Sequence, residues 1–442
     1  MPFRKPEQIR EADKGFEGSE ILLVEDSRAY TVALRKRLET DYGMKVTSCA
    51  TLELLASALE ENPDRFTLSL IDLNLPGTPS GEALDLVSAK NVPAILFTSN
   101  ASDLRRKQVL TKQFADYVLK DGQKGIERLI EATVRILSNR SAHILIVDDS
   151  ALMRDMLSEQ LLSQLYRVTS VASSRQALEV LDENTEFDLA LINHLMPEMN
   201  GLALVEQIRS RTELDDMRII GVSTLEDKSL AARFLRAGAN DFLIQPLVIE
   251  ELRGRVAQNI EISSQIGKLR ELAARDYLTG IYNRRHFFEN GPRRVALSRK
   301  QGRGQALAIV DIDHFKLIND TYGHEVGDVV LKAVACQLRK YCGHSHLLSR
   351  MGGEEFGILI SDCSFADARR FCEFVRYAIE FLLIKTDDGD VKVTVSIGLA
   401  EIADKESFDN YLNAADQFLY MAKSAGRNRV FSETDLAVRA VA

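Results

Sequence analysis

Residues 66–76 read FTLSLIDLNLP, and residues 187–197 read FDLALINHLMP. Both stretches consist of an apolar run, a few polar residues and a proline, and they stand about 120 residues apart, the size of an ordinary domain. Three further pairs recur at a similar spacing: ILLVEDS at 21–27 with ILIVDDS at 144–150, ILFTSN at 95–100 with IIGVSTLED at 219–227, and ADYVLKD at 115–121 with NDFLIQP at 240–246. The repeat predicts two tandem copies of one domain.

Within each copy, short apolar runs alternate with amphipathic stretches such as SGEALDLVSAK in the first copy and SRQALEVLDEN in the second. This alternation predicts a parallel sheet with helices on both faces, which is a flavodoxin-like α/β fold. In such a sheet, functional side chains gather at the carboxyl ends of the strands. The residues that follow each apolar run are therefore the candidate site residues.

The whole chain has 442 residues, 45% hydrophobic and 27% charged, which suggests about three packed domains. A net charge of −9, without a basic segment or a helix-turn-helix pattern, argues against binding to nucleic acid. No apolar run is long enough to cross a membrane, and the charged N-terminal stretch does not resemble a signal peptide, so we expect a cytoplasmic location. The five cysteines form no metal-type cluster, which favours idle thiols.

In the first copy, polar residues follow four predicted strands: Glu25 and Asp26 the first, Asp72 the third, Thr98 the fourth and Lys120 the fifth. Three acids around one point repel one another unless a divalent cation such as Mg²⁺ lies among them. Lys120 would neutralise a phosphoryl group on Asp72, and the Thr98 hydroxyl would bond to one of its oxygens. This constellation resembles the receiver domain of two-component response regulators. The resemblance implies that a sensor histidine kinase or phosphotransfer protein phosphorylates Asp72, and that Thr98 and Tyr117 then reorient.

The second copy lacks the groups on which this chemistry depends. It keeps four other positions of the constellation: Asp148, Asp149, Ser223 and Phe242. Asn193 stands at the position of Asp72, however, and Gln245 stands at the position of Lys120. Because an amide does not accept a phosphoryl group as a carboxylate does, we expect this receiver to be degenerate and to be kept for its surfaces.

Residues 248–275 contain no proline and carry apolar residues at Ile262, Ile266, Leu269 and Ala273. These steps of four and three residues form a heptad seam, which predicts a short coiled-coil stalk. A lone amphipathic helix packed on its own domain is the alternative.

Five motifs follow the stalk: DYLTGIYNRRHF (276–287), ALAIVDIDHFKLINDTYGHEVGDVVL (306–331), LLSRMGGEEFGILI (347–360), VTVSIGLA (393–400) and DQFLYMAKSAGRNRV (416–430). Gly352 and Gly353 let the backbone approach a ligand closely, as phosphate sites often require. We expect Asp311 and Asp313 to alternate on one strand and to point to opposite faces, so that only Asp311 shares a metal with Glu354. The basic residues Lys316, Lys423 and Arg427 are suited to a triphosphate, and Asn319 and Asp328 to the donor edge of a guanine.

These motifs, over about residues 270–433, resemble the α+β GGDEF domain of diguanylate cyclases, for which GGEEF is an accepted active form of the signature. The resemblance implies condensation of two GTP into cyclic di-GMP and two pyrophosphates. It implies that Asp311, the Ile312 carbonyl and Glu354, supported by Glu355, hold Mg²⁺ or Mn²⁺. It makes Glu354 the base for the 3′-hydroxyl and Lys316 a stabiliser of transition-state charge. The remaining substrate contacts that it implies are guanine at Asn319, Asp328 and nearby His324, and phosphate at Lys423, Arg427 and the two glycines.

The family's product-inhibition motif is altered in this sequence. That motif is R-x-x-D, with its aspartate six residues before the first glycine of GGEEF, and the positions are Gly343 and His346 here. Because both charged ligands are missing, we predict weak or no product inhibition through this position. Arg284 and Arg285 are candidates for a second basic patch.

The expected layout resembles PleD-like response regulators, in which the second receiver supports dimerisation. It comprises a charged tail (1–19), a phosphoacceptor receiver (20–140), a degenerate receiver (141–250), a helical stalk (251–274), a GGDEF domain (275–433) and a tail (434–442). Each GGDEF domain binds one GTP and the product is twofold symmetric, so we expect a homodimer. A catalytically silent GTP-binding scaffold is the alternative function.

Overall fold

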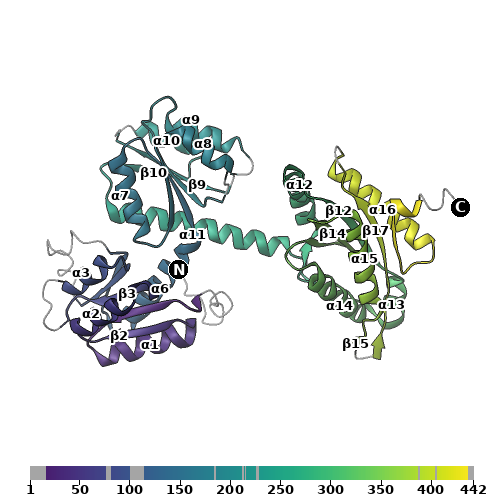
Figure 1. Ribbon diagram of the computed structural model, residues 1–442, viewed down its shortest axis with the longest axis horizontal. Helices are drawn as coiled ribbons and strands as arrows, with labels where there is room; N and C mark the ends of the chain where they lie inside the picture. The colour runs from purple at the N-terminus through teal and green to yellow at the C-terminus, as the bar shows by residue number, and fades with distance from the viewer. Residues whose placement is uncertain are drawn as a thin grey trace. The chain divides into compact units, whose positions relative to one another are not determined.

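The computed structural model (Figure 1) describes residues 16–75, 81–99, 114–183, 186–211, 214, 216–224, 228–386, 389–403 and 406–436. The chain divides into two compact units, Met1–Gln265 and Ile266–Ala442. The first unit holds two five-stranded sheets, and the second holds a six-stranded sheet and a two-stranded one. Within the described residues, no helix has both the length and the apolar character that crossing a membrane requires.

The first sheet is parallel, with strand order β2-β1-β3-β4-β5. Its strands are β1 (Glu20–Val24), β2 (Lys45–Cys49), β3 (Phe66–Asp72), β4 (Ala94–Thr98) and β5 (Asp116–Leu119). The helices are α1 (Arg28–Tyr42), α2 (Leu52–Glu61), α3 (Glu82–Ala89) and α6 (Gly122–Ser138), with short 3-10 turns η3 (Pro63–Arg65) and η4 (Asn139–Ser141). Ile21 and Leu23 pack with α1 and α6, whereas Leu22 and Val24 pack with α2 and α3. Alternate residues of β1 therefore serve opposite faces, and both faces are covered by helices.

The second sheet repeats this arrangement, with strand order β7-β6-β8-β9-β10 and parallel pairing. Its strands are β6 (His143–Val147), β7 (Arg167–Val171), β8 (Leu189–Asn193), β9 (Arg218–Ser223) and β10 (Asp241–Ile244). Helices α8 (Ser174–Glu183), α9 (Gly201–Arg209) and α10 (Lys228–Arg236) cover one face, and α7 (Ala151–Leu162) and α11 (Ile249–Ala274) cover the other. The repeat predicted from the sequence is thus a repeat of structure.

Helix α11 is a single unbroken helix of 26 residues. Leu252 and Val256 in its first half are buried against the second sheet. Farther along, Ile266 is 37% exposed and Leu269 is 65% exposed. The first half of α11 therefore packs on the receiver, while these apolar residues of the heptad seam face solvent.

The third sheet has strand order β11-β13-β14-β12-β17-β18, and its central strand β12 is antiparallel to both neighbours. Its strands are β11 (Tyr282–Asn283), β12 (Gln305–Ile312), β13 (Leu347–Gly352), β14 (Glu355–Ser361), β17 (Val395–Glu401) and β18 (Val430–Ser432). One face carries α13 (Phe315–Tyr322), α14 (His324–Cys342) and α15 (Phe365–Glu380), and the other carries α12 (Arg284–Lys300) and α16 (Phe408–Ser424). Strands β15 (Ile384–Thr386) and β16 (Gly389–Val391) form the two-stranded sheet.

Helix α16 lies directly on β17 because Gly398 has no side chain. A Cβ at this glycine would lie 2.0 Å from the carbonyl oxygen of Ala415 and 2.3 Å from the amide nitrogen of Leu419. Real Cβ atoms do not approach that closely, so any other residue would push the helix away. This close packing fixes the height of α16 above the sheet and brings its C-terminal Lys423 to the end of β12.

Candidate functional sites

The first receiver gathers three carboxylates at the carboxyl end of its sheet. Oxygen atoms of Glu25, Asp26 and Asp72 all lie within 4.8 Å of one another. Glu25 and Asp72 are buried, and Asp26 is exposed. Burial raises the pKa of Glu25, and the nearby Lys120 only partly offsets this effect. A cluster of carboxylate oxygens open to solvent on one side fits a hard divalent cation.

Lys120 bridges two of these acids. Its Nζ lies 2.7 Å from Glu25 Oε2 and 2.6 Å from Asp72 Oδ2. Burial lowers the pKa of Lys120, but its hydrogen bonds to the two carboxylates outweigh this and raise the pKa overall. The ammonium group also lies 5.0 Å from the ring centres of Tyr30 and Phe97, within cation–π range. The lysine is therefore charged and held against the expected phosphoacceptor.

Thr98 is buried at the end of β4, and its Oγ1 lies 3.5 Å from Asn74 Nδ2. The backbone amide of Lys120 donates to the Thr98 carbonyl at 2.7 Å, which joins the ends of β4 and β5. Tyr117 of β5 is different, because its side chain is 45% exposed. The structure thus brings together Glu25, Asp26, Asp72, Thr98 and Lys120, and leaves Tyr117 at the surface.

The second receiver keeps the backbone of this site. The amide of Gln245 donates to the Ser223 carbonyl at 2.8 Å, which repeats the Lys120–Thr98 bond of the first receiver. Asp148 is buried, and burial raises the pKa of its carboxyl group. Phe242 packs on Phe234, with ring centres 5.2 Å apart.

The two substituted side chains change what that backbone carries. Asn193 Nδ2 donates to Asp149 Oδ1 at 3.2 Å and to the Leu195 carbonyl at 3.0 Å. The amide thus donates to an acid at the position where the first receiver offers a carboxylate. Gln245 is neutral and cannot supply the charge that Lys120 supplies.

In the second unit, Asp311 lies near the end of β12 and is only 4% exposed. Its Oδ2 forms an ion pair of 2.8 Å with Lys423 Nζ at the end of α16. Burial raises the pKa of Asp311 to about 6; Lys423 opposes the shift, and Glu354 and Glu355 add to it. A buried carboxylate in this acidic surrounding is stabilised in its ionised form by a cation.

The other expected metal ligands lie beside Asp311. Glu355 pairs with Asp311 across the β12–β14 ladder, and the Ile312 amide lies 3.4 Å from the Glu354 carbonyl. Glu354 and Glu355 are half-buried. Carboxylate and carbonyl oxygens on two adjoining strand ends are a donor set that fits Mg²⁺ or a similar hard cation.

The turn between β13 and β14 requires its two glycines. Gly352 has a φ of +146° and Gly353 a φ of +51°, which other residues rarely adopt, and nothing lies within 4 Å of the Cβ position of either. The Gly353 carbonyl accepts hydrogen bonds from Arg350 Nε at 3.0 Å and Nη2 at 2.8 Å. Arg350 also pairs with Asp276 at 3.1 Å. Sequence reasoning missed Arg350 and Asp276, although each is a charged residue within a quoted motif.

The residues expected to read guanine lie on α13 and α14. Asn319 is half-buried on α13, and His324 and Asp328 are exposed in the first turns of α14. A Cβ at Gly327 would lie 1.9 Å from Asn319 Oδ1, so Gly327 leaves the space that the Asn319 amide occupies. Lys316, at the start of α13, is exposed.

The expectation that Asp311 and Asp313 alternate on one strand is wrong. Residues two apart in a strand share a face. Strand β12 ends at Ile312, however, and Asp313 belongs to the turn that follows. Asp313 bonds to the Thr394 and Ser396 hydroxyls instead of Lys423.

Comparison with known families agrees with this architecture. The profile described as "Response regulator receiver domain" matches residues 21–133 and 144–257, about half of the chain. The chain belongs to the response regulator family. The profile "Diguanylate cyclase, GGDEF domain" matches residues 273–429 of this response regulator, and its third domain is therefore a diguanylate cyclase domain.

Individual relatives match different shares of the chain. Response regulator PleD of Caulobacter vibrioides is 27% identical over 93% of this chain and 98% of its own length. Diguanylate cyclase VdcA of Vibrio cholerae is 38% identical over 39% of this chain and 52% of its own. A solved two-component response regulator/GGDEF domain protein is 33% identical, covering 56% of this chain and 99% of its own, with a TM-score of 0.49.

These matches confirm the predicted family, fold class and enzyme class of this response regulator. Diguanylate cyclases of the GGDEF type use divalent metal ions and GTP, and receiver domains imply a phosphodonor partner. The domain bounds, the identity of the metal and the roles of single residues remain predictions.

The segment with the altered inhibition motif, residues 343–346, takes part in the local packing of this response regulator. Gly343 follows the last residue of α14 and has a φ of +55°. His346 Nδ1 accepts the Ser361 amide at 3.3 Å, and its ring packs edge-on against Phe371. Burial lowers the pKa of His346. The histidine is thus a neutral packing residue and not a substitute for a carboxylate.

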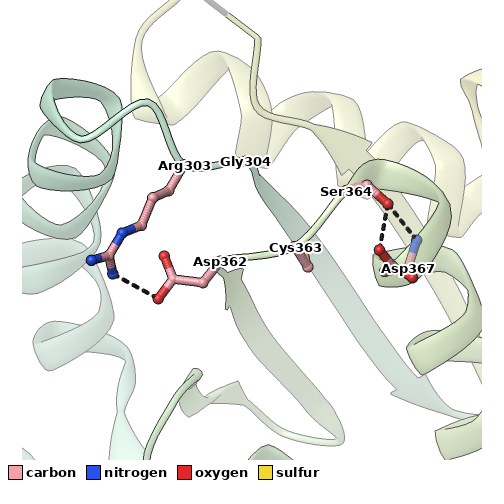
Figure 2. A pocket seen from close by; sticks show the side chains of 6 residues that line it. All are labelled: Arg303, Gly304, Asp362, Cys363, Ser364 and Asp367. Carbon is pink, nitrogen blue, oxygen red and sulfur yellow. Dashed lines mark hydrogen bonds and ion pairs between the residues drawn. The ribbon is translucent and has the colours of Figure 1, made fainter.

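An open cavity of about 600 Å³ lies at the end of β14, next to Ser361, whose amide bonds to His346 (Figure 2). It is lined by Arg303, Gly304, Asp362, Cys363, Ser364 and Asp367. Arg303 pairs with Asp362 at 3.0 Å across it. The lining residues adjoin the start of β12 and the end of β14, whereas Asp311 and Glu354 lie at the opposite ends of these strands. This cavity is therefore separate from the expected GTP site.

Both arginines of the proposed second basic patch already have partners on α12. The Arg284 guanidinium lies 5.2 Å from the Phe288 ring centre, and Arg285 Nε pairs with Glu289 at 2.7 Å. Arg285 is nevertheless largely exposed, and exposed pairs of this kind exchange readily for another anion.

Proposed function

We propose that this response regulator condenses two GTP molecules into cyclic di-GMP and two pyrophosphates, and that phosphorylation of Asp72 controls the rate. The observation that carries the proposal is the surrounding of Asp311. A buried carboxylate, a lysine 2.8 Å away, two further acids and a turn of two open glycines all lie at one end of the sheet. This combination suits a nucleoside triphosphate, because it offers cations for phosphate and carboxylates for a metal.

In the proposed reaction, Glu354 accepts the proton of the 3′-hydroxyl of one GTP. The freed oxygen attacks the α-phosphorus of the other GTP, a new P–O bond forms, and pyrophosphate leaves with the electron pair of the broken bond. The same step with the roles of the two nucleotides exchanged closes the ring. Lys316 stabilises the charge that develops on the phosphate. A divalent cation held by Asp311, the Ile312 carbonyl and Glu354 would supply further charge neutralisation.

The remaining residues bind and orient the substrate. Those proposed for the guanine base are Asn319, Asp328 and His324, and those proposed for the phosphates are Lys423, Arg427, Gly352 and Gly353. Lys423 pairs with Asp311 in the structure. We infer that this pair opens on substrate binding: Lys423 then binds a phosphate of GTP, and the Asp311 carboxylate would be free to hold the cation.

Two copies of the chain are needed, because each domain offers one half of a twofold product. Holding the two substrates face to face then supplies much of the rate. The exposed seam of α11, with Ile266 and Leu269, is a surface on which two such helices would pack. The degenerate receiver would add surface to the same dimer.

The switch is proposed to lie in the first receiver. Asp72 would take a phosphoryl group from a histidine kinase or a phosphotransfer protein, with Lys120 neutralising it and Thr98 binding one of its oxygens. A divalent cation, proposed to be Mg²⁺, would be held by Glu25, Asp26 and Asp72. The second receiver is proposed to lack this chemistry because of Asn193 and Gln245.

The test is to incubate the purified full-length protein with GTP and Mg²⁺ and to measure pyrophosphate and cyclic di-GMP. Glu354→Gln should abolish both products while GTP still binds. The wild-type protein binding GTP without releasing pyrophosphate, with or without beryllium fluoride, would reject the enzyme and favour the silent scaffold.

A further inference from the structure

Asp313 is a buried acid that the proposed reaction does not use. It is 4% exposed and follows the last residue of β12. Its Oδ1 accepts the Ser396 hydroxyl at 2.6 Å, and its Oδ2 accepts the Thr394 hydroxyl at 2.7 Å. Oδ2 also accepts the backbone amide of Asn428 at 3.0 Å, from a residue 115 positions away. A buried carboxylate with three donors is well satisfied, so the cluster is rigid.

The bond to Asn428 holds a strained turn. Arg427 has a φ of +61° and Asn428 a φ of +46°, the left-handed region that residues other than glycine rarely adopt. Two consecutive residues in this region keep it only where the surroundings impose it. The carboxylate of Asp313 supplies one such restraint through the main chain.

The side chain of Asn428 supplies the others. Its Oδ1 accepts Arg376 Nη1 at 2.8 Å, and its Nδ2 donates to Glu380 Oε1 at 3.0 Å, so α15 grips the same residue. Arg427, the residue before it, remains exposed. The turn thus has one residue anchored from two sides and one residue presented to solvent.

We propose that Asp313 is a positioning residue for the substrate phosphates: its carboxylate fixes the Arg427–Asn428 turn and thereby aims the Arg427 guanidinium at GTP. This inference rests on the proposed function, in which Arg427 binds phosphate. The two acids at the end of β12 then have separate roles. Asp311 pairs with Lys423 at the end of α16, and Asp313 holds the turn that follows the same helix.

A packing role and a positioning role predict different results. If Asp313 only stabilised the fold, its loss would lower the melting temperature and the fraction of active protein without changing the KM for GTP. If it aims Arg427, its loss raises the KM, and the effect disappears once Arg427 is gone. Arg427→Ala, Asp313→Asn and the double variant form the cycle that separates the two roles.

The experiment measures kcat and KM for GTP, by pyrophosphate release, on the full-length protein. Asp313→Asn replaces the carboxylate by an amide, which places an N–H group or a weaker acceptor opposite the Thr394 hydroxyl, the Ser396 hydroxyl and the Asn428 amide. We expect the KM for GTP to rise about tenfold, with kcat within about twofold of the wild type. On the Arg427→Ala background, Asp313→Asn should change the KM by less than about twofold. Ser396→Ala is the matched control, since it removes a bond from Oδ1 but leaves the Asn428 bond on Oδ2, and its KM should rise by no more than about twofold.

An unchanged KM in Asp313→Asn, or an equal further rise on the Arg427→Ala background, would overturn the inference while leaving the proposed function intact. An unchanged KM in Arg427→Ala would instead reject the phosphate role of Arg427 itself, and the inference with it. Should Asp313→Asn fail to fold, Asn428→Gly loosens the same turn from the other side. Asn428→Gly is expected to raise the KM for GTP in the wild type but not on the Arg427→Ala background. An unchanged KM in the wild type, or an equal rise on both backgrounds, would overturn the inference.

Discussion

The ammonium group of Lys120 lies 2.6 Å from the carboxylate of Asp72, although 48 positions separate the two residues in the chain. Both groups are largely buried, so their charges interact with little screening by water. At the equivalent positions of the second receiver, Asn193 bonds to Asp149 and Gln245 carries no charge. The two receivers thus share a backbone and differ in the one charge pair that would accept a phosphoryl group.

The first prediction follows from this pair. Beryllium fluoride or acetyl phosphate should raise both the dimer fraction, measured by light scattering, and the rate of pyrophosphate release. The reason is that Lys120 is already in place to neutralise the added group. Asp72→Asn should ignore both reagents. An equal response from that variant would move the switch to another part of the chain.

A second prediction concerns phosphorylation of the degenerate receiver. It is tested on an Asp72→Asn background, so that the expected phosphoacceptor of the first receiver does not contribute to the signal. Asn193→Asp alone should incorporate little phosphate from labelled acetyl phosphate, since Gln245 cannot offset the charge. Adding Gln245→Lys should raise the incorporation several-fold. Incorporation by Asn193→Asp alone at the level of the wild-type Asp72 site would show that the lysine is dispensable.

The third prediction uses the clearance between Gly327 and Asn319. Gly327→Ala should displace the Asn319 amide, because the added Cβ would lie 1.9 Å from its Oδ1. Losing a hydrogen bond to guanine corresponds to about 1–2 kcal/mol, so the KM for GTP should rise roughly tenfold. Asn319→Ala should have a similar effect, and the double variant should be little worse than either. Gly267→Ala, where a Cβ meets nothing within 4 Å, is the control.

The fourth prediction is a pH dependence. Burial raises the pKa of Asp311 to about 6, and only the ionised carboxylate binds a metal. Activity should therefore be retained above this pKa and be lost as the pH falls through about 6. A higher Mg²⁺ concentration should move the midpoint to lower pH, because metal and proton compete. The measurement is the basal rate of pyrophosphate release between pH 5 and 8 at two Mg²⁺ concentrations. It is made on Asp72→Asn, so that phosphorylation of the first receiver does not contribute. A midpoint that does not depend on Mg²⁺ would contradict the assignment of Asp311 as a metal ligand.

The fifth prediction concerns feedback. Gly343 offers no side chain and His346 is neutral and packed against Phe371, so neither replaces the arginine and aspartate that bind the phosphates of cyclic di-GMP in the family's inhibition site. Added product should inhibit only weakly in progress curves, with calorimetry on the same protein as a check. Arg284 and Arg285 are the residues to mutate if inhibition is found. Sub-micromolar inhibition that survives their loss would show that the 343–346 segment still forms a site.

The repeat, the parallel sheets and most of the first receiver's site followed from the sequence because they depend on local rules. Strand ends at one edge of a parallel sheet bring Glu25, Asp72, Thr98 and Lys120 together whatever the details of packing. Tyr117 was harder to place, since the direction of a side chain on an edge strand depends on its neighbours. It lies at the surface in this structure.

The second unit held contacts that spacing does not reveal. The Asp311–Lys423 pair joins a strand end to a helix end far along the chain, and it depends on the close approach of α16 at Gly398. The partners of the Asp313 side chain depend on where β12 ends, and strand boundaries are the least certain part of a sequence-based prediction. The bond of Arg350 to the Gly353 carbonyl belongs to the same class, because it requires the register of a hairpin.

The unbroken course of α11 has a consequence for changes in chain length. Each residue in an α-helix turns the chain by about 100°, so inserting one residue after Gln265, beyond the part of α11 that packs on the second sheet, would rotate everything that follows by roughly that amount, whereas seven residues return almost to the starting angle. The helix contains no proline between Ile249 and Ala274 at which such a rotation would be absorbed. The activity of variants with insertions or deletions in this segment should therefore rise and fall with the number of residues changed, with a period of about seven. The rotation about the helix axis should matter more than the length of the helix.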